Sequence, residues 1–231
     1  MANMRPIRIT PHIYQVGGST TSDMRDGAVY LINLGEIILI DSGTGIGFAQ
    51  IVRNIVSLGL SPDLVSTVIL THCHIDHVGG AAEFKFRFGS NIVMHTLDAE
   101  IVERGDQYMS AAFCFNIALT RFRVDRKLTG EEEILRFGSS TITCLHTPGH
   151  TAGSIVVYLD IDERRVLFGQ DIGAPLLEEF KCDPIAWRSS MDKLIALEAD
   201  ILCEGHAGVY RPKDRARAYI EHSIRSHGFP L

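Results

Sequence analysis

The chain has 231 residues and a mass of 25.5 kDa, a length that suits one large domain or two small ones. Hydrophobic residues make up 45% of it, charged residues 22%, and the mean hydropathy is +0.10, which excludes an intrinsically disordered chain. Its 28 acidic and 22 basic side chains give a formal charge of −6, so it lacks the basic face that a general nucleic-acid binder needs.

Apolar runs and cysteines indicate the cellular compartment of the protein. The longest apolar run, around residues 37–40, is far too short to cross a bilayer, and the first residues carry no apolar stretch of the signal-peptide type. The five cysteines are an odd number, are widely spaced and include no C-x-x-C pair, which is typical of a reducing compartment. We therefore expect a cytoplasmic protein with no membrane partner.

The first half of the chain predicts strands followed by an alternation of strands and helices. Gly35 predicts the turn of an apolar hairpin, and the apolar residues of 48–58 recur at helical spacing. Gly79 and Gly80 let the chain turn into a helix that runs toward Phe88. The predicted strands are 7–10, 13–16, 28–34, 36–40, 67–70 and 91–94, and a further helix is predicted at 97–103.

The second half predicts a return to strands, closed by helices. Asp183 is suited to cap a helix that starts at Pro184, because Asp is favoured at the N-cap and Pro at the first helical position. No linker divides the sequence, so we predict an α/β protein of one domain, residues 1–231, with sheets in the middle and helices outside. The predicted strands are 140–145, 154–159, 165–169 and 201–203, and the last helix is predicted at 212–222.

Three histidines and an aspartate form an H-x-H-x-D-H segment directly after a predicted buried strand. In an extended chain His72, His74 and Asp76 point to one side, and a bend then brings His77 toward them. Two imidazoles are suited to hold one metal ion, and a carboxylate with an imidazole to hold a second. Ligands of α/β proteins gather at the carboxyl ends of strands, which favours a metal site here.

Three further candidate ligands follow later strands. His150 lies in the turn Thr-Pro-Gly-His-Thr-Ala-Gly-Ser, Asp171 follows the strand predicted at 165–169, and His206 follows the strand predicted at 201–203. Because each lies just beyond a strand, all three are expected to converge on one edge of the sheets.

These motifs resemble the metallo-β-lactamase fold superfamily, and Asp41-Ser42-Gly43 resembles its early Asp-x-Gly turn. The resemblance implies a four-layer αββα sandwich with a metal site at one edge of the two sheets and a variable insertion at about 105–124. It implies two divalent ions, zinc first, with iron or manganese as alternatives. It implies a first metal on His72, His74 and His150, a second on Asp76, His77 and His206, a bridging Asp171, and an Asp41 that orients the ligand loops.

At three positions this chain differs from particular branches of the superfamily, which makes those branches less suitable. The β-lactamases of this fold carry Cys at the position of Asp171, and its flavodiiron proteins carry Glu at the position of His74. The lactonases of the fold carry Tyr at the position of Ala174. None of these branches is therefore the first expectation.

The expected activity is hydrolysis of a small thioester or ester by a hydroxide that bridges the two metals, similar to the glyoxalase II branch. A site loaded in this way keeps a charge of about +1, which favours an anionic tetrahedral intermediate, and Asp76 is suited to orient the hydroxide. No general acid lies near the motifs, so a thiolate, which needs little protonation, suits the leaving group. Lys181 is a candidate for binding an anionic substrate. Met109 and Phe113 are candidates for the wall of the substrate pocket or for a homodimer contact.

Four alternatives stay open at this point. A persulfide dioxygenase of the same fold would bind one iron through His72, His150 and Asp171. A lactonase or phosphodiesterase would use the same ligands on another ester. Ribonuclease-Z-like processing is disfavoured by the acidic balance. The non-enzymatic alternative is an effector that binds metal but catalyses no reaction. The expected partner is a small-molecule substrate, not nucleic acid.

Overall fold

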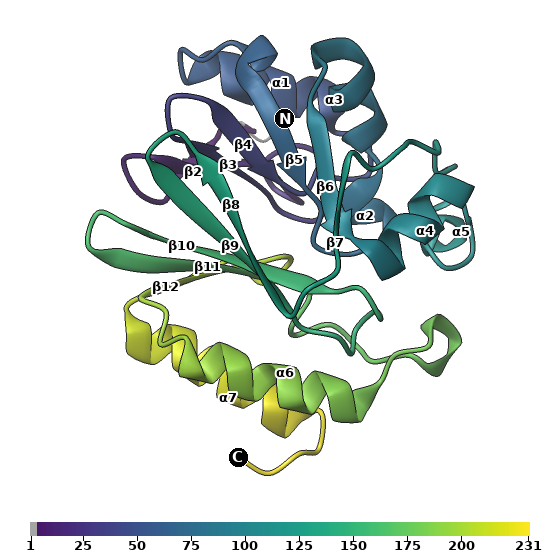
Figure 1. Ribbon diagram of the computed structural model, residues 1–231, viewed down its shortest axis with the longest axis vertical. Coiled ribbons are helices and arrows are strands. Elements are labelled where there is room, and N and C mark those ends of the chain that lie inside the picture. The colour runs from purple at the N-terminus through teal and green to yellow at the C-terminus, as the bar shows by residue number, and fades with distance from the viewer. Residues whose placement is uncertain (1–3) are drawn as a thin grey trace. The chain divides into compact units, whose positions relative to one another are not determined.

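The computed structural model describes residues 4–231, and the chain divides between Thr129 and Gly130 into two compact units (Figure 1). Each unit has a β-sheet and helices of its own. Among the described residues, no helix combines the length and the apolar composition that crossing a membrane requires.

The first unit is built on a seven-stranded sheet whose strands, within residues 4–129, lie in chain order. Neighbouring strands are antiparallel from β1 to β4 and parallel from β4 to β7. The strands are β1 (Ile7–Arg8), β2 (Ile13–Gly17), β3 (Val29–Asn33), β4 (Ile37–Ile40), β5 (Val65–Ile69), β6 (Asn91–His95) and β7 (Arg126–Leu128). The helices are α1 (Phe48–Ser57), α2 (Ile75–Val78), α3 (Ala81–Phe88), α4 (Thr96–Arg104) and α5 (Ala112–Phe115), with a 3₁₀ turn at Pro62–Leu64.

Helices α1, α3 and α4 share one hydrophobic core with the sheet of the first unit. Apolar side chains at helical spacing in α1, among them Ile51 and Ile55, pack into the same cluster as Phe84 of α3 and Val102 of α4. The helix α3 runs back from the end of β5, after the candidate ligand segment 72–77, and α4 runs back from the end of β6. The carboxyl ends of the parallel strands therefore lie at one edge of this sheet, and the carboxyl ends of α3 and α4 lie at the other.

The second unit is a six-stranded sheet covered by α6 and α7 (Figure 1). All of its neighbouring strands are antiparallel except β11 and β12, which are parallel, and Trp187 of α6 is buried in its core. In sheet order the strands are β13 (Val209–Tyr210), β12 (Ile201–Glu204), β11 (Arg164–Gln170), β10 (Ile155–Ile161), β9 (Ser140–His146) and β8 (Glu132–Phe137). The helices are α6 (Pro184–Ala196) and α7 (Lys213–Ser226), with a 3₁₀ turn at Glu178–Phe180.

Most predicted elements are confirmed, with shifted ends. The carboxylate of Asp183 accepts the N–H groups of Ile185 and Ala186 at 3.0 Å each, so the predicted cap of α6 is present. The strand predicted at 7–10 is shorter than expected, because only Ile7–Arg8 pairs with β2. The last helix continues past its predicted end to Ser226.

Candidate metal centre

The segment Thr71–His77 leaves the carboxyl end of β5 and is fixed along its backbone by neighbours from the first unit. The N–H of Cys73 donates to Oδ2 of Asp98 at 2.9 Å. Two residues on, the N–H of Ile75 donates to the carbonyl oxygen of Ser110 at 2.8 Å. Hydrogen bonds spaced this closely hold the side chains between them in one geometry before any ligand arrives.

The expectation of an extended segment from His72 to Asp76 is wrong in its second half. The chain is non-helical from Thr71 to His74, but the short helix α2 begins at Ile75, so Asp76 and His77 lie in its first turn. The N–H groups of His77 and Val78 donate to the carbonyl oxygen of His74 at 3.0 Å, which closes that turn. A helical turn, in place of the predicted strand alternation and bend, brings Asp76 and His77 beside His72 and His74.

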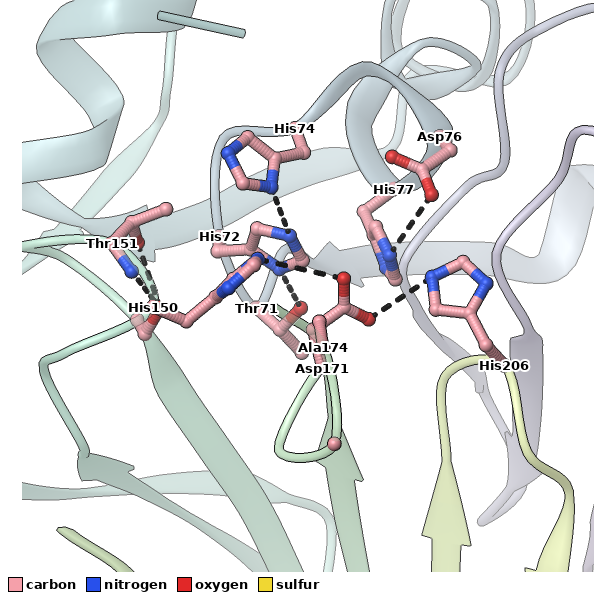
Figure 2. Close-up of polar contacts among 12 residues, drawn as sticks. Thr71, His72, His74, Asp76, His77, His150, Thr151, Asp171, Ala174 and His206 are labelled. Atoms are coloured by element: carbon pink, nitrogen blue, oxygen red, sulfur yellow. Dashed lines mark hydrogen bonds and ion pairs between the residues drawn. The ribbon is translucent and has the colours of Figure 1, made fainter. Parts of the chain in front are cut away.

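The four side chains of the motif lie together and are buried (Figure 2). Nε2 of His72 lies 3.1 Å from Nδ1 of His74, and the rings of His72 and His77 have their centroids 4.3 Å apart. Oδ2 of Asp76 lies 3.5 Å from Nε2 of His77. The first unit thus gathers three imidazoles and one carboxylate at the edge where β5 ends.

Asp41, at the end of β4, connects this cluster to the sheet. Its Oδ2 lies 2.7 Å from Nδ1 of His77, and its Oδ1 accepts the N–H of Thr71 at 2.8 Å. The hydroxyl of Thr71 donates to Oδ2 at 2.8 Å. Because Nδ1 of His77 donates to a carboxylate, the lone pair of that ring lies on Nε2, beside Asp76.

Two further residues shape the cluster, and no motif in the sequence singled them out. Asp98 is buried in α4 and holds Cys73. A Cβ added at Gly27 would lie 2.7 Å from Cε1 of His77, so only glycine allows the chain to pass this ring, and the N–H of Gly27 donates to the carbonyl of Asp76 at 3.0 Å. Both partners are distant in sequence from the motif, so local patterns carried no signal for them.

In the second unit, a tight turn between β9 and β10 presents His150. The N–H of Thr151 donates to the hydroxyl of Ser154 at 3.0 Å, and the two hydroxyl groups lie 2.7 Å apart, so both side chains stabilise the turn. Gly149 has φ +140°, and a Cβ there would lie 2.3 Å from Cα of Trp187 in α6. The turn therefore sits directly against the start of α6.

The carboxylate of Asp171 lies between two imidazoles of the second unit (Figure 2). Its Oδ2 is 3.5 Å from Nε2 of His150, and its Oδ1 is 3.2 Å from Nε2 of His206. Asp171 and His150 are buried, whereas the side chain of His206 is 46% exposed. The parallel pairing of β11 with β12 places the loops that follow these two strands side by side.

Glu204 holds the loop that carries His206, and the sequence motifs missed it. Its Oε2 accepts the N–H of His206 at 2.7 Å and the N–H of Ala207 at 2.6 Å. Burial raises the pKa of the Glu204 carboxyl, and the nearby Asp171 carboxylate raises it further. The signal that could have found it is its place at the end of a buried strand, two residues before a histidine.

The donor chemistry of both units fits divalent metal ions. Imidazole nitrogens 3.1 Å apart cannot both carry a proton toward each other, so at least one of the facing nitrogens of His72 and His74 presents a lone pair. A carboxylate between two imidazoles, as Asp171 is, offers one oxygen to each side. Imidazole and carboxylate are the donors that zinc, iron and manganese accept in proteins.

The three predicted substrate residues have different surroundings. Met109 is half-buried and packs against the core of the first unit, while its carbonyl oxygen lies 3.6 Å from the thiol of Cys73. Phe113 is 52% exposed and stacks on Tyr108, with ring centroids 5.1 Å apart. Lys181 is exposed in the second unit, at the end of the 3₁₀ turn that follows Asp171.

A family model described as the metallo-beta-lactamase superfamily matches residues 23–206. The chain belongs to this superfamily. Solved metallo-beta-lactamases have the same fold: one from Cronobacter sakazakii, a motif mutant, is 22% identical with a TM-score of 0.81, over 96% of this chain and 94% of that one. A subclass B3 enzyme of Bradyrhizobium japonicum is 24% identical with a TM-score of 0.77, over 97% and 92% of the two chains. The predicted α/β fold of the metallo-β-lactamase type is confirmed.

The alignments with curated relatives of known name cover less of each chain than the alignments with these solved structures do. The acyl-coenzyme A thioesterase of Homo sapiens is 27% identical over 152 residues, 56% of this chain and 52% of the relative. The hydroxyacylglutathione hydrolase of Dechloromonas aromatica is 26% identical over 180 residues, 77% of this chain and 56% of the relative. The chain thus spans about half the length of these relatives.

Proposed function

We propose that the protein is a metal-dependent hydrolase of small thioesters or esters and that the ligands of its two units surround two divalent ions, zinc by preference. The observation that carries this proposal is the pairing of donors within each unit: contacting imidazoles after β5, and a carboxylate between two imidazoles after β11 and β12. The proposed ligands are His72, His74 and His150 for one ion, Asp76, His77 and His206 for the other, and Asp171 between them.

Bound divalent ions would supply a Lewis acid and an acidified water at neutral pH. The residues of the chain do the rest. Asp41 holds His77 in one tautomer, and the hydrogen bonds of Asp98 and Ser110 to the backbone keep the motif in place. The carboxylate of Asp76 accepts a hydrogen bond from the attacking water and orients it toward the carbonyl carbon.

The thioester class is supported by leaving-group chemistry and by the relatives. Asp41 already engages Nδ1 of His77 and Thr71, which leaves Asp76 as the motif's own carboxylate beside the imidazoles, and a thiolate leaves without a proton donor of its own. Both named relatives carry thioester-hydrolase names, one for acyl-coenzyme A and one for hydroxyacylglutathione. Lys181 is proposed as a contact for an anionic part of the substrate.

The aromatic pair Tyr108 and Phe113 is proposed as the apolar wall of the substrate site. The two exposed rings stack with an interplanar angle of 6°, and Ser110, between them in sequence, bonds the ligand segment through Ile75. Apolar rings that a folded chain leaves exposed beside a reactive segment are suited to cover an acyl chain.

Substitution of Phe113 tests this wall. We expect Phe113→Ala to raise KM for an octanoyl thioester by about fivefold and to leave KM for the acetyl thioester within about twofold, since each buried methylene contributes about 0.8 kcal/mol. Leu64→Ala is the matched control, because Leu64 is also about half exposed but precedes β5, at the far end of that strand. Equal effects on both substrates would contradict the assignment.

The proposed function is tested by measuring metal content and turnover on one sample. We expect about two zinc ions per chain, hydrolysis of thioesters ahead of lactones and phosphodiesters, and loss of turnover on chelation that zinc restores. One iron per chain with oxygen uptake on a persulfide would instead establish the dioxygenase. Full metal loading with no turnover across the panel would establish an effector.

A further inference from the structure

A groove of about 770 Å³ opens on the first unit, away from the ligand segment. Its walls come from the last turn of α3, the last turn of α4 and the segment before and within β7. Its volume lies in the range of sites that hold small ligands. The lining residues are Lys85, Phe86, Glu103, Arg121, Phe122, Arg123, Val124, Asp125 and Lys127.

Four cations and two carboxylates line this groove, which gives it a formal charge of +2 in a chain whose formal charge is −6. The carboxylates engage the two lysines: Lys85 contacts Asp125 at 2.6 Å, and Lys127 contacts Glu103 at 2.6 Å. The same carboxylates also accept backbone N–H groups, Asp125 that of Ile92 and Glu103 that of Val124. Each carboxylate therefore fixes the wall of the groove twice, through its ion pair with a lysine and through its hydrogen bond from a backbone N–H.

The two arginines complete the groove without being part of these pairs. Arg121 and Arg123 are exposed, and within residues 4–231 no carboxylate lies within ion-pair distance of either guanidinium. Arg123 lies between the two lysine pairs along the chain, because the next residue, Val124, bonds Glu103 and the one after it, Asp125, pairs with Lys85. A guanidinium presents a planar fork of donors that matches a phosphate group.

An exposed aromatic ring lies at the same groove. Phe86 is 69% exposed, although it belongs to a helix whose neighbouring Phe84 is fully buried. An exposed ring beside guanidinium groups can stack on a planar base while the arginines hold its phosphates.

The groove lies far from the candidate metal centre within the first unit. The ligand segment follows the carboxyl end of β5, whereas α3 and α4 end, and the segment before β7 enters, at the amino edge of the parallel strands. A strand of five residues such as β6 spans about 17 Å, so the two sites are separated by roughly that distance.

We propose that this groove is a second ligand site, which binds a small phosphorylated molecule with an aromatic ring, of the nucleoside polyphosphate class. Arg121 and Arg123 bind the phosphates, and Phe86 stacks on the ring. The inference does not rest on the proposed hydrolase function, because its residues are separate from the proposed ligands and its test is a binding measurement.

Calorimetry of the full chain at low salt tests the proposal, with ATP and inorganic pyrophosphate as probes. We expect one ATP per chain, and we expect Arg121→Glu with Arg123→Glu to weaken binding of both probes by at least about tenfold. Phe86→Ala should weaken the affinity for ATP by about fivefold and leave the affinity for pyrophosphate unchanged, since only ATP carries an aromatic ring. The charge-neutral pair Arg121→Gln and Arg123→Gln should give a smaller loss and provides the test if charge reversal impairs folding.

Arg53→Glu is the matched control, since Arg53 is an exposed arginine of α1 in the same unit and does not line the groove. It should leave both affinities within about twofold. Binding must persist after chelation. Absence of ATP binding, binding that the arginine variants leave intact, or binding that disappears with the metal would overturn the proposal. If Phe86→Ala weakened the binding of ATP and of pyrophosphate equally, the assignment of Phe86 to stacking on the ligand's aromatic ring would be wrong.

Discussion

Replacing Asp171 by alanine should lower thioester turnover by about three orders of magnitude and release metal from the protein. The carboxylate lies between Nε2 of His150 and Nε2 of His206, so its removal takes a donor from both proposed ions at once. A catalytic metal contributes several kcal/mol of charge stabilisation, and about 4 kcal/mol corresponds to a thousandfold change in rate.

Metal content distinguishes a bridging ligand from a terminal one. Under the proposed arrangement Asp171→Ala should retain less than one ion per chain, whereas His206→Ala should lose only the second ion and retain about one. The melting temperature gives a readout independent of activity: chelation should lower it in the unmodified protein and leave it nearly unchanged in Asp171→Ala, because bound metal stabilises only the folded state.

The control for this series is Asp214→Ala, which removes an exposed aspartate from the first turn of α7. Its turnover and metal content should match those of the unmodified protein. Full metal content in Asp171→Ala, or turnover within tenfold of the original, would contradict the proposed role of the carboxylate.

Much of the fold follows from local patterns in the sequence, and the exceptions have physical causes. The hairpin at Gly35 was predicted because both of its strands are continuous apolar runs, which are buried on both faces, and α1 was predicted because its buried side chains recur at helical spacing. Strand β8 was missed because three of its six residues are charged and its Ile134 is 52% exposed, so an edge strand did not look like a core element. Strand β7 has only three residues and takes its place by pairing with β6.

In the candidate site, too, some residues could be predicted from the sequence and others could not. Residue types and spacing identified the histidines and aspartates as candidate ligands, because metal chemistry restricts which side chains can serve. The groups that hold them could not be predicted, since Asp98 lies 25 residues from Cys73 and meets it only in the folded unit. The start of α2 at Ile75 was missed for a related reason: one helical turn has no periodicity to detect, and its first N–H is satisfied by the distant Ser110.

Gly149→Ala should destabilise the protein by about 3–5 kcal/mol. The backbone at Gly149 has φ +140°, a region that residues with a Cβ rarely adopt. The new Cβ would also lie 2.3 Å from Cα and Cβ of Trp187, atoms that cannot rotate away because α6 is anchored there. The carbonyl of Gly149 accepts the N–H of Asp183 at 2.7 Å, so the turn cannot retreat without breaking the start of α6.

Gly138→Ala separates the two causes, because Gly138 also has positive φ, +57°, but no atom of the described chain lies within 4 Å of a Cβ added there. It should cost only about 1–2 kcal/mol, the penalty of the left-handed conformation alone. Urea unfolding of both variants measures the difference. Since His150 follows Gly149 directly, the alanine variant should also weaken zinc binding, and zinc added in excess should recover part of the lost stability. Equal stabilities of the two variants would mean that the turn and α6 can separate at little cost, and the position of His150 would then not be fixed by the start of that helix.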